Sequence, residues 1–106
     1  MRDYKIYSKI NRIIEVRKTF LSVKQKEPEQ LKFLGMFNYC LSSLKEEYIF
    51  VLQNTYFNHS YHFWWLDYYS KSSFYRKRFT AVSSFVALFE MIYENFNDCP
   101  DFISFA

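Results

Sequence analysis

The densest cluster of chemically versatile side chains lies between Ser70 and Arg78, where four bases fall within eight residues. Ammonium and guanidinium groups bind phosphate, and interleaved hydroxyls add hydrogen bonds to phosphate oxygens and base edges. The bases of this cluster are Lys71, Arg76, Lys77 and Arg78, and its hydroxyls are Ser70, Ser72, Ser73 and Tyr75. The same composition is common on solvated helix faces, so the elements that hold the cluster decide between the two interpretations.

Catalytic and metal chemistry have less support in the sequence. His59 and His62 are spaced for one helical turn, but the two cysteines that could join them, Cys40 and Cys99, lie far away in the chain. There is no glycine-rich phosphate loop and no local grouping of serine, histidine and acid. We therefore expect no catalytic residue, no metal and no cofactor. Cys40 and Cys99 are expected to be a buried apolar thiol and a thiol near a loose tail.

The composition favours helices. Phe, Trp and Tyr make up 24% of the 106 residues, whereas the chain has one Gly and two Pro. Because the turns of a β-sandwich or barrel need many such residues, the sequence predicts an all-α fold, a small bundle of about five helices in one domain. Residues 1–42 are expected to form supporting helices, residues 43–95 a helix-turn-helix unit, and residues 96–106 a tail that folds back beyond Pro100.

The first two predicted helices carry apolar residues three and four positions apart. Residues 3–23 form a six-turn amphipathic helix whose basic face is either solvated or available to phosphate. Pro28 suits the first turn of a second helix, which begins near Glu29. In this helix Gly35 is either a weak point or a place of close helix approach. The residues expected to be buried there are Leu31, Leu34, Phe37, Leu41 and Leu44.

Two serines predict the starts of the next helices. Ser43 and Glu46 match a capping box, in which each side chain bonds a backbone N–H of the other residue, and they open a helix over residues 44–56. Ser60 is expected to cap a short helix over residues 61–67. That short helix is aromatic nearly all round, so it must be wedged between neighbours or exposed to a partner.

Ser70 is expected to cap the last and longest helix, which runs to about Tyr93. A helix-turn-helix places the first turns of such a helix in the major groove of DNA, with an apolar inner face and a polar or cationic outer face. With Ser70 as the cap, Phe74 and Ala81 point inward. The residues on the opposite side are then Lys71, Ser72, Tyr75 and Arg76.

Residues 44–89 resemble region four of bacterial sigma factors and, more closely, the phage-type ArpU transcriptional regulators. The similarity is strongest in a motif near S-x-S-T-hydrophobic-Tyr-Arg, which here reads Ser70-Lys71-Ser72-Ser73-Phe74-Tyr75-Arg76. The resemblance implies a regulator of transcription that binds double-stranded DNA and acts alone or through RNA polymerase. It implies DNA contacts from Lys71, Ser72, Tyr75 and Arg76, and Ser73 and Lys77 in the same two turns complete the candidate DNA-binding set.

Two positions depart from the pattern of these families. The turn before the last helix usually contains Gly, but here it must be made by Asp67-Tyr68-Tyr69. Arg78 stands where an aliphatic residue is expected. Either the last helix is rotated slightly or Arg78 snorkels to the surface.

Charge is distributed unevenly. The net charge is +3, with eight of the fourteen bases in the first 26 residues and no base in the last 17. The folded domain should therefore have one side that attracts phosphate. The N-terminus alternates charged and apolar residues, unlike a signal peptide, and the longest apolar runs are far shorter than the ~20 residues that span a bilayer. We expect a cytoplasmic protein with no membrane partner.

The aromatic excess supports an alternative function. One small core cannot hold so many large rings, so part of the aromatic surface is available to bind a partner or a second copy of the chain. The same helical bundle would then be a non-catalytic protein-interaction or dimerisation module. A basic face around Arg76 favours DNA, whereas a wide aromatic patch there favours a protein partner.

Overall fold

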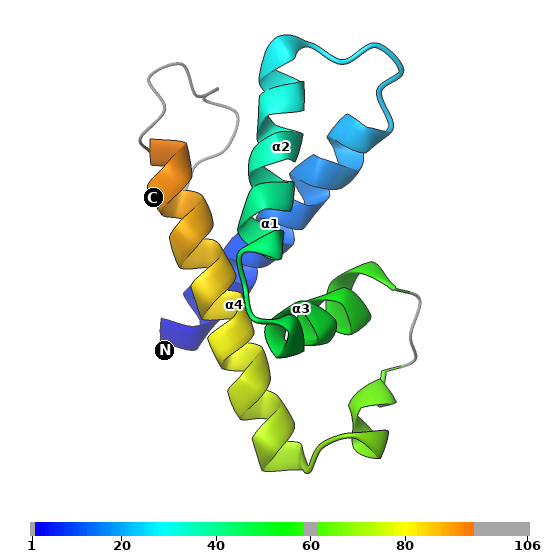
Figure 1. Ribbon diagram of the computed structural model, residues 1–106, viewed down its shortest axis with the longest axis vertical. Coiled ribbons are helices and arrows are strands. Elements are labelled where there is room, and N and C mark those ends of the chain that lie inside the picture. Colours follow the sequence, from blue (N-terminus) through cyan, green and yellow to red (C-terminus); the bar gives the residue numbers. More distant parts are fainter. Residues whose placement is uncertain (1, 59–61, 95–106) are drawn as a thin grey trace.

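The computed structural model describes residues 2–58 and 62–94, with side chains from residue 5 onward (Figure 1). It contains α1 (Arg2–Leu21), α2 (Pro28–Ser42), α3 (Glu46–Leu52) and α4 (Lys71–Glu94). A π-helical turn, Gln53–Phe57, extends α3, and a single 3₁₀ turn, Trp64–Asp67, precedes α4. No strand occurs in these described ranges, so the all-α fold is confirmed.

The number of helices differs from the expected five. Within the described residues there are four α-helices, because the helix expected over residues 61–67 is reduced to the 3₁₀ turn. Ser60, its expected cap, lies outside the described residues, as do His59, Cys99 and the tail over residues 96–106. None of the helices described is both long and apolar enough to pass through a bilayer.

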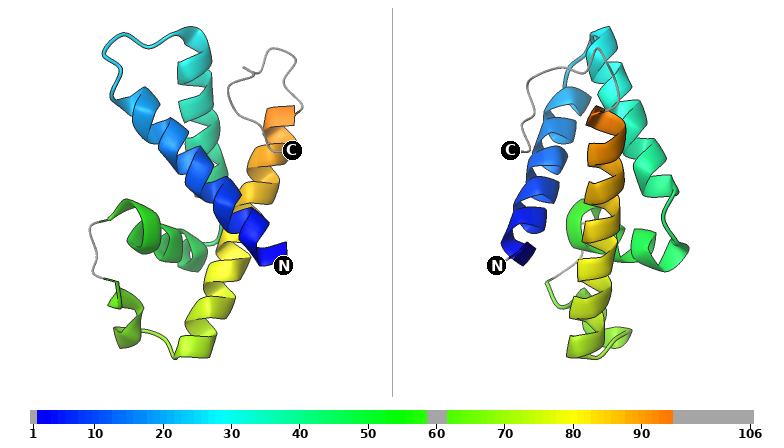
Figure 2. Two further views of the ribbon diagram at one scale, coloured as in Figure 1. Left: turned by 180° about the vertical axis from the view of Figure 1, so that it is seen from behind. Right: turned by 90° about the vertical axis from the view of Figure 1, so that its left-hand side faces the viewer.

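Helix α4 is the central element of the arrangement. It packs against each of the other three helices, and α1 packs against α2. In Figure 1, α1 passes behind the middle of α4, α2 lies beside its second half, and α3 lies beside its middle. The first turns of α4 extend beyond α1 and α2, together with the 3₁₀ turn, and Figure 2 shows the same separation from behind and from the side.

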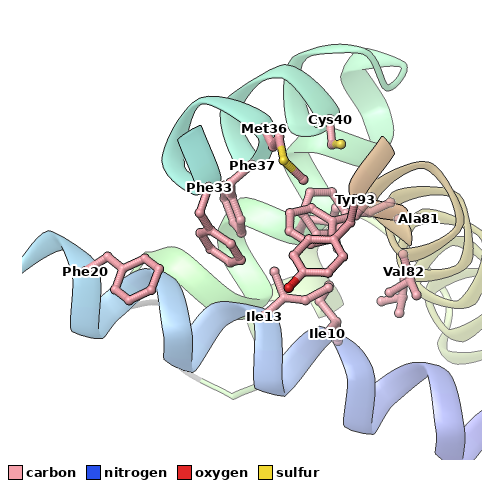
Figure 3. Close-up of a cluster of buried hydrophobic side chains, with 14 residues drawn as sticks. Ile10, Ile13, Phe20, Phe33, Met36, Phe37, Cys40, Ala81, Val82 and Tyr93 are labelled. Carbon is pink, nitrogen blue, oxygen red and sulfur yellow. The ribbon is translucent and has the colours of Figure 1, made fainter. Parts of the chain in front are cut away.

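The main core lies where α1, α2 and α4 meet (Figure 3). Ile10 and Ile13 of α1 are almost fully buried, as the predicted stripe requires. Ring edges meet ring faces across the helices: Phe33 lies 5.3 Å from Phe89, and Phe37 lies 5.1 Å from Phe85, between ring centroids. Such edge-to-face pairs add to the stabilisation from buried area. The core therefore fixes the second half of α4.

The expected buried stripe of α2 was partly wrong. Its buried residues are Phe33, Met36, Phe37 and Cys40, which also follow the spacing of one helical face. Leu31 is 56% exposed, and Leu34, Leu41 and Leu44 pack only at the margin of the core. The predicted row of buried residues and the observed row both fit a 3.6-residue period. The row with the larger rings faces inward because those rings find partners on α1 and α4.

The capping box expected at Ser43 and Glu46 is absent. Ser43 keeps a helical backbone at the end of α2, so its hydroxyl donates to the carbonyl oxygen of Tyr39 at 2.7 Å. An N-cap needs an extended backbone, and Lys45 supplies it with ψ of 149°. A capping box forms instead at the start of α2, where the N–H of Glu27 donates to Gln30 Oε1 at 2.8 Å.

The basic residues of α1 are not all free of partners. Lys9 Nζ lies 2.7 Å from Glu90 Oε2 on α4. The guanidinium of Arg17 lies over the rings of Phe37 and Phe57, at 4.7 and 5.2 Å from their centroids. Lys5, Arg12 and Lys18 remain exposed. Part of the basic face therefore holds α1 to its neighbours, and three cations are left facing solvent.

Gly35 offers a stability test. A Cβ built at this position meets no heavy atom within 4 Å, so the glycine does not serve a close helix approach. Gly35→Ala should raise the free energy of unfolding by roughly 0.5–1 kcal/mol, because alanine loses less backbone entropy in a helix. Urea denaturation followed by circular dichroism measures it. A loss of stability would instead show that a neighbour needs the space.

Cys40 offers a test of pH dependence. Burial raises the pKa of its thiol from the ordinary 9.0 to about 11. The folded state holds the thiol proton more tightly than the unfolded chain does, so this contribution to stability is complete below about pH 9 and is lost as pH rises toward about 11. With Cys99→Ser as the common background, the free energy of unfolding should fall more steeply across this window with Cys40 present than in Cys40→Ala. Parallel pH profiles would contradict the burial effect.

Candidate nucleic-acid interface

A second, smaller hydrophobic cluster holds the start of α4. Its buried members are Val51, Trp64, Trp65 and Phe74, and we call it the satellite cluster. The rings of Trp65 and Phe74 are stacked, with centroids 4.7 Å apart and planes 4° from parallel. Trp64 meets Phe74 edge-on at 5.6 Å. These contacts fix the 3₁₀ turn against the first turn of α4.

Helix α3 connects the satellite cluster to the main core. Val51 and Leu52 are consecutive and both are buried, but Val51 belongs to the satellite cluster and Leu52 to the main core. Neighbouring helical residues point about 100° apart, so one short helix can serve two clusters. The direction of the first turns of α4 is therefore set relative to the whole bundle.

The start of α4 forms as the sequence predicts. The backbone N–H of Ser73 donates to Ser70 Oγ at 3.2 Å, which confirms Ser70 as the cap. The turn before it needs no glycine, because no described residue has a positive φ. The N–H groups of Tyr68 and Tyr69 both donate to the carbonyl oxygen of Trp65, at 3.0 and 2.9 Å. An ordinary right-handed backbone thus makes the turn.

The candidate DNA-binding residues divide into faces of α4. Lys71 and Tyr75 share one face, Ser72 and Arg76 share the next, and all four are exposed. Phe74 is buried on the inner side, as expected. The first turn of α4 contains no acid, so its free N–H groups and partial positive charge have no carboxylate of their own helix beside them. This combination is suited to an anion.

Ser73 and Lys77 share a third face, which turns toward α3, and both are half-buried. Lys77 Nζ lies 3.1 Å from Glu47 Oε1 and 5.7 Å from the centre of the Tyr69 ring. Its charge is thus partly engaged within the protein, unlike those of Lys71 and Arg76. Glu46 and Glu47, in the first turn of α3, also bring negative charge toward this side.

Arg78 is half-buried. The helix is not rotated, because Phe74 and Ala81 both face inward. The guanidinium lies over the ring of Tyr7 on α1, 4.5 Å from its centroid, and donates to the Tyr56 hydroxyl at 3.5 Å. Within the described residues its Nε is buried and has no hydrogen-bond partner.

Large apolar side chains are exposed at the same end of the molecule. On the 3₁₀ turn and its flanks, Phe63 is 50%, Leu66 58% and Tyr68 63% exposed, while Trp64 and Trp65 are buried. On α4, Tyr75 and Phe79 are also exposed. The tryptophans of the aromatic segment are therefore wedged inside, whereas Phe63, Leu66 and Tyr68 are exposed. We call Phe63, Leu66 and Tyr68 the apolar rim.

A cavity that no sequence pattern indicates lies beside this surface. It has a volume of about 450 Å³ and lies between the π-helical turn, the 3₁₀ turn and α4. Thr55 and Arg78 are among the residues that line it, and each has one buried polar atom. No motif or charge run in the sequence marks Thr55, because only the fold places it at the same cavity as Arg78. In the part of the chain that is described, no three metal-binding side chains come together.

No protein-family model, curated protein or solved structure matches the chain. The likeness of residues 44–89 to sigma region four and to ArpU regulators therefore stays a prediction. The function has to be argued from the geometry of α4 and its surroundings.

The Trp65–Phe74 stack yields a stability prediction. Phe74→Ala should lower the free energy of unfolding by about 3–5 kcal/mol, because it removes a buried ring and leaves a cavity. Phe79→Ala is the matched control, since Phe79 lies on the same helix but is exposed. Urea denaturation monitored by tryptophan emission measures both variants. Equal losses of stability in the two would contradict the role given to the satellite cluster.

Proposed function

We propose that the protein is a non-catalytic, DNA-binding regulator of transcription that places the first two turns of α4 in the major groove. One observation carries the proposal. These turns extend beyond the main core with Lys71, Ser72, Tyr75 and Arg76 exposed, while Phe74 beneath them is held by the satellite cluster. A rigid helix end with free polar side chains is what base reading requires.

Each exposed side chain has a role suited to its position. Ser72 and Arg76 lie on one face and would meet base edges, where arginine pairs with guanine through two parallel hydrogen bonds. Lys71 stands at the helix N-terminus, where a phosphate would also receive backbone N–H groups. Tyr75 would donate its hydroxyl to the sugar-phosphate backbone. Ser73 and Lys77 would act from the side, with Lys77 exchanging Glu47 for a phosphate on binding.

In this proposal the 3₁₀ turn takes the place of the first helix of a helix-turn-helix. It is much shorter than such a helix, but its two buried tryptophans anchor the turn as a longer helix would. The regulator would act in the cytoplasm, alone or with RNA polymerase. The exposed cations of α1 would add phosphate contacts only where the bound DNA reaches them.

A protein-interaction or dimerisation module is the second candidate. The observation that favours it is the apolar rim, in which three large side chains are each at least half exposed beside α4. Exposed aromatic side chains are typical of the centres of protein interfaces. The rim lies at the same end of the molecule as Arg76, so a partner protein or a second copy would compete with DNA for this end.

DNA binding is tested with the full chain and fluorescent genomic duplex fragments. Wild type should bind with an affinity that falls steeply as salt increases, because cations released from phosphate drive the binding. The Lys71→Ala, Arg76→Ala double variant should bind at least about tenfold more weakly and reduce the log–log salt slope by about two. Fluorescence anisotropy at several salt concentrations measures both effects.

Lys24→Ala is the matched control, because Lys24 is an exposed base in the loop between α1 and α2, away from the start of α4. It should bind like wild type. Absence of salt-sensitive binding to any duplex would rule the DNA proposal out. Sedimentation of the same samples addresses the second candidate: a dimer that is lost on Leu66→Ser would support it, and a strict monomer would count against self-association.

A further inference from the structure

We propose that the cavity between the π-helical turn, the 3₁₀ turn and α4 is a binding site for a small aromatic carboxylate. The site goes beyond the DNA-binding proposal and does not depend on it. Its volume of about 450 Å³ falls within the range of small-molecule sites. Three separate elements line it, so the fold and not a local motif creates it.

Two of the residues that line the cavity each have a buried polar atom without a partner within the described residues. These are Thr55 Oγ1 and Arg78 Nε, and both are shielded from solvent. A threonine hydroxyl inside a helix ordinarily donates to the carbonyl oxygen four residues earlier, as Thr19 does to Glu15 at 3.0 Å in α1. Thr55 does not, although it too lies in a helical segment. Buried polar groups without partners are uncommon, and a small rotation of these two side chains on binding would let a ligand supply the missing bonds.

The π-helical turn explains why Thr55 is left without this bond. The N–H of Asn58 donates to the carbonyl oxygen of Gln53 at 2.7 Å, a five-residue interval in place of the usual four. This wider turn changes the direction of the side chains that it carries, and Asn54, Thr55 and Tyr56 all line the cavity. Single π-helical turns occur frequently at binding sites.

The charge of Arg78 indicates that the ligand is an anion. Guanidinium stays protonated in proteins, and within the described residues no carboxylate pairs with Arg78. Its present contacts are neutral: the Tyr7 ring at 4.5 Å and the Tyr56 hydroxyl at 3.5 Å. A partly buried cation with only neutral partners gains most from a carboxylate, which can accept two hydrogen bonds from it.

The remaining walls indicate a planar ring. Trp64, Trp65, Phe74 and Tyr75 all line the cavity, and the Trp65–Phe74 stack holds two of these rings in fixed orientations. Aromatic rings pack well against further flat rings, edge-on or offset. A ring among these walls with its carboxylate toward Thr55 and Arg78 would satisfy the apolar and the polar parts of the site together.

The site carries its own spectroscopic reporter, because the only two tryptophans of the chain, Trp64 and Trp65, both line it. Titration of the DNA-free full chain with benzoate should change tryptophan emission saturably. Benzamide, the neutral analogue, and inorganic phosphate, the ring-free anion, should each bind at least about tenfold more weakly. Isothermal titration calorimetry provides a second, independent reading.

Two variants test the polar contacts. Arg78→Gln should weaken benzoate binding at least about tenfold, and Thr55→Val, which keeps the side-chain shape, should weaken it about 2- to 10-fold. Arg76→Gln, on the outer face of the same helix, is the control and should bind benzoate like wild type. Circular dichroism checks that each variant folds. If Arg78→Gln does not fold, Thr55→Val still tests the polar contacts to benzoate.

Absence of saturable benzoate binding to the wild type would overturn the proposal. Unchanged affinity in Thr55→Val and in any folded Arg78→Gln would overturn it as well. Benzamide binding as tightly as benzoate would overturn the assignment of an anion, and phosphate binding as tightly would overturn the assignment of a ring. Because no DNA is present, these outcomes are independent of the test of DNA binding.

Discussion

The stack of Trp65 on Phe74 is the contact on which both candidate surfaces depend. The two rings, whose planes are only 4° from parallel, join the ends of a ten-residue segment. This segment runs from the 3₁₀ turn to the first turn of α4. Because Phe74 is held on the inner side, the face with Ser72 and Arg76 is directed to solvent, and the next face, which begins with the exposed Lys71, carries Tyr75 and Arg78 along the edge of the cavity. One aromatic pair thus orients two chemically different surfaces.

The two hydrophobic clusters enclose different parts of α4. The main core encloses the second half of α4 with rings from α1 and α2, and the satellite cluster encloses its first turn. Val51 and Leu52 of α3 join the two clusters through adjacent backbone positions. The long helix is therefore anchored over its length while its outer face stays available.

Local patterns in the sequence were enough for α1, α2 and α4 and for the start of α4, but not for residues 61–67, where a helix was expected and a 3₁₀ turn is found. The 3.6-residue period located α1, α2 and α4, and Ser70 was correctly identified as a cap because a cap depends on neighbours in sequence. The patterns failed where two arrangements fit the local sequence equally well. In α2, Leu31 and Phe33 both suited the buried face, but only Phe33 is buried. At Ser43, the predicted capping box does not form. The ion pair of Lys77 and the cavity lined by Thr55 and Arg78 depend on contacts between distant segments, so no local spacing could indicate them.

The unequal size of the two clusters also has a consequence for motion. Four buried residues hold the start of α4, against fourteen in the main core, so the satellite cluster is the part expected to open first without global unfolding. The amides of residues 73–77 would then exchange with solvent through a subglobal opening of lower free energy than those of residues 81–93. Any molecule that binds at this end, on the outer face or in the cavity, would suppress that opening and so slow the exchange of the same amides.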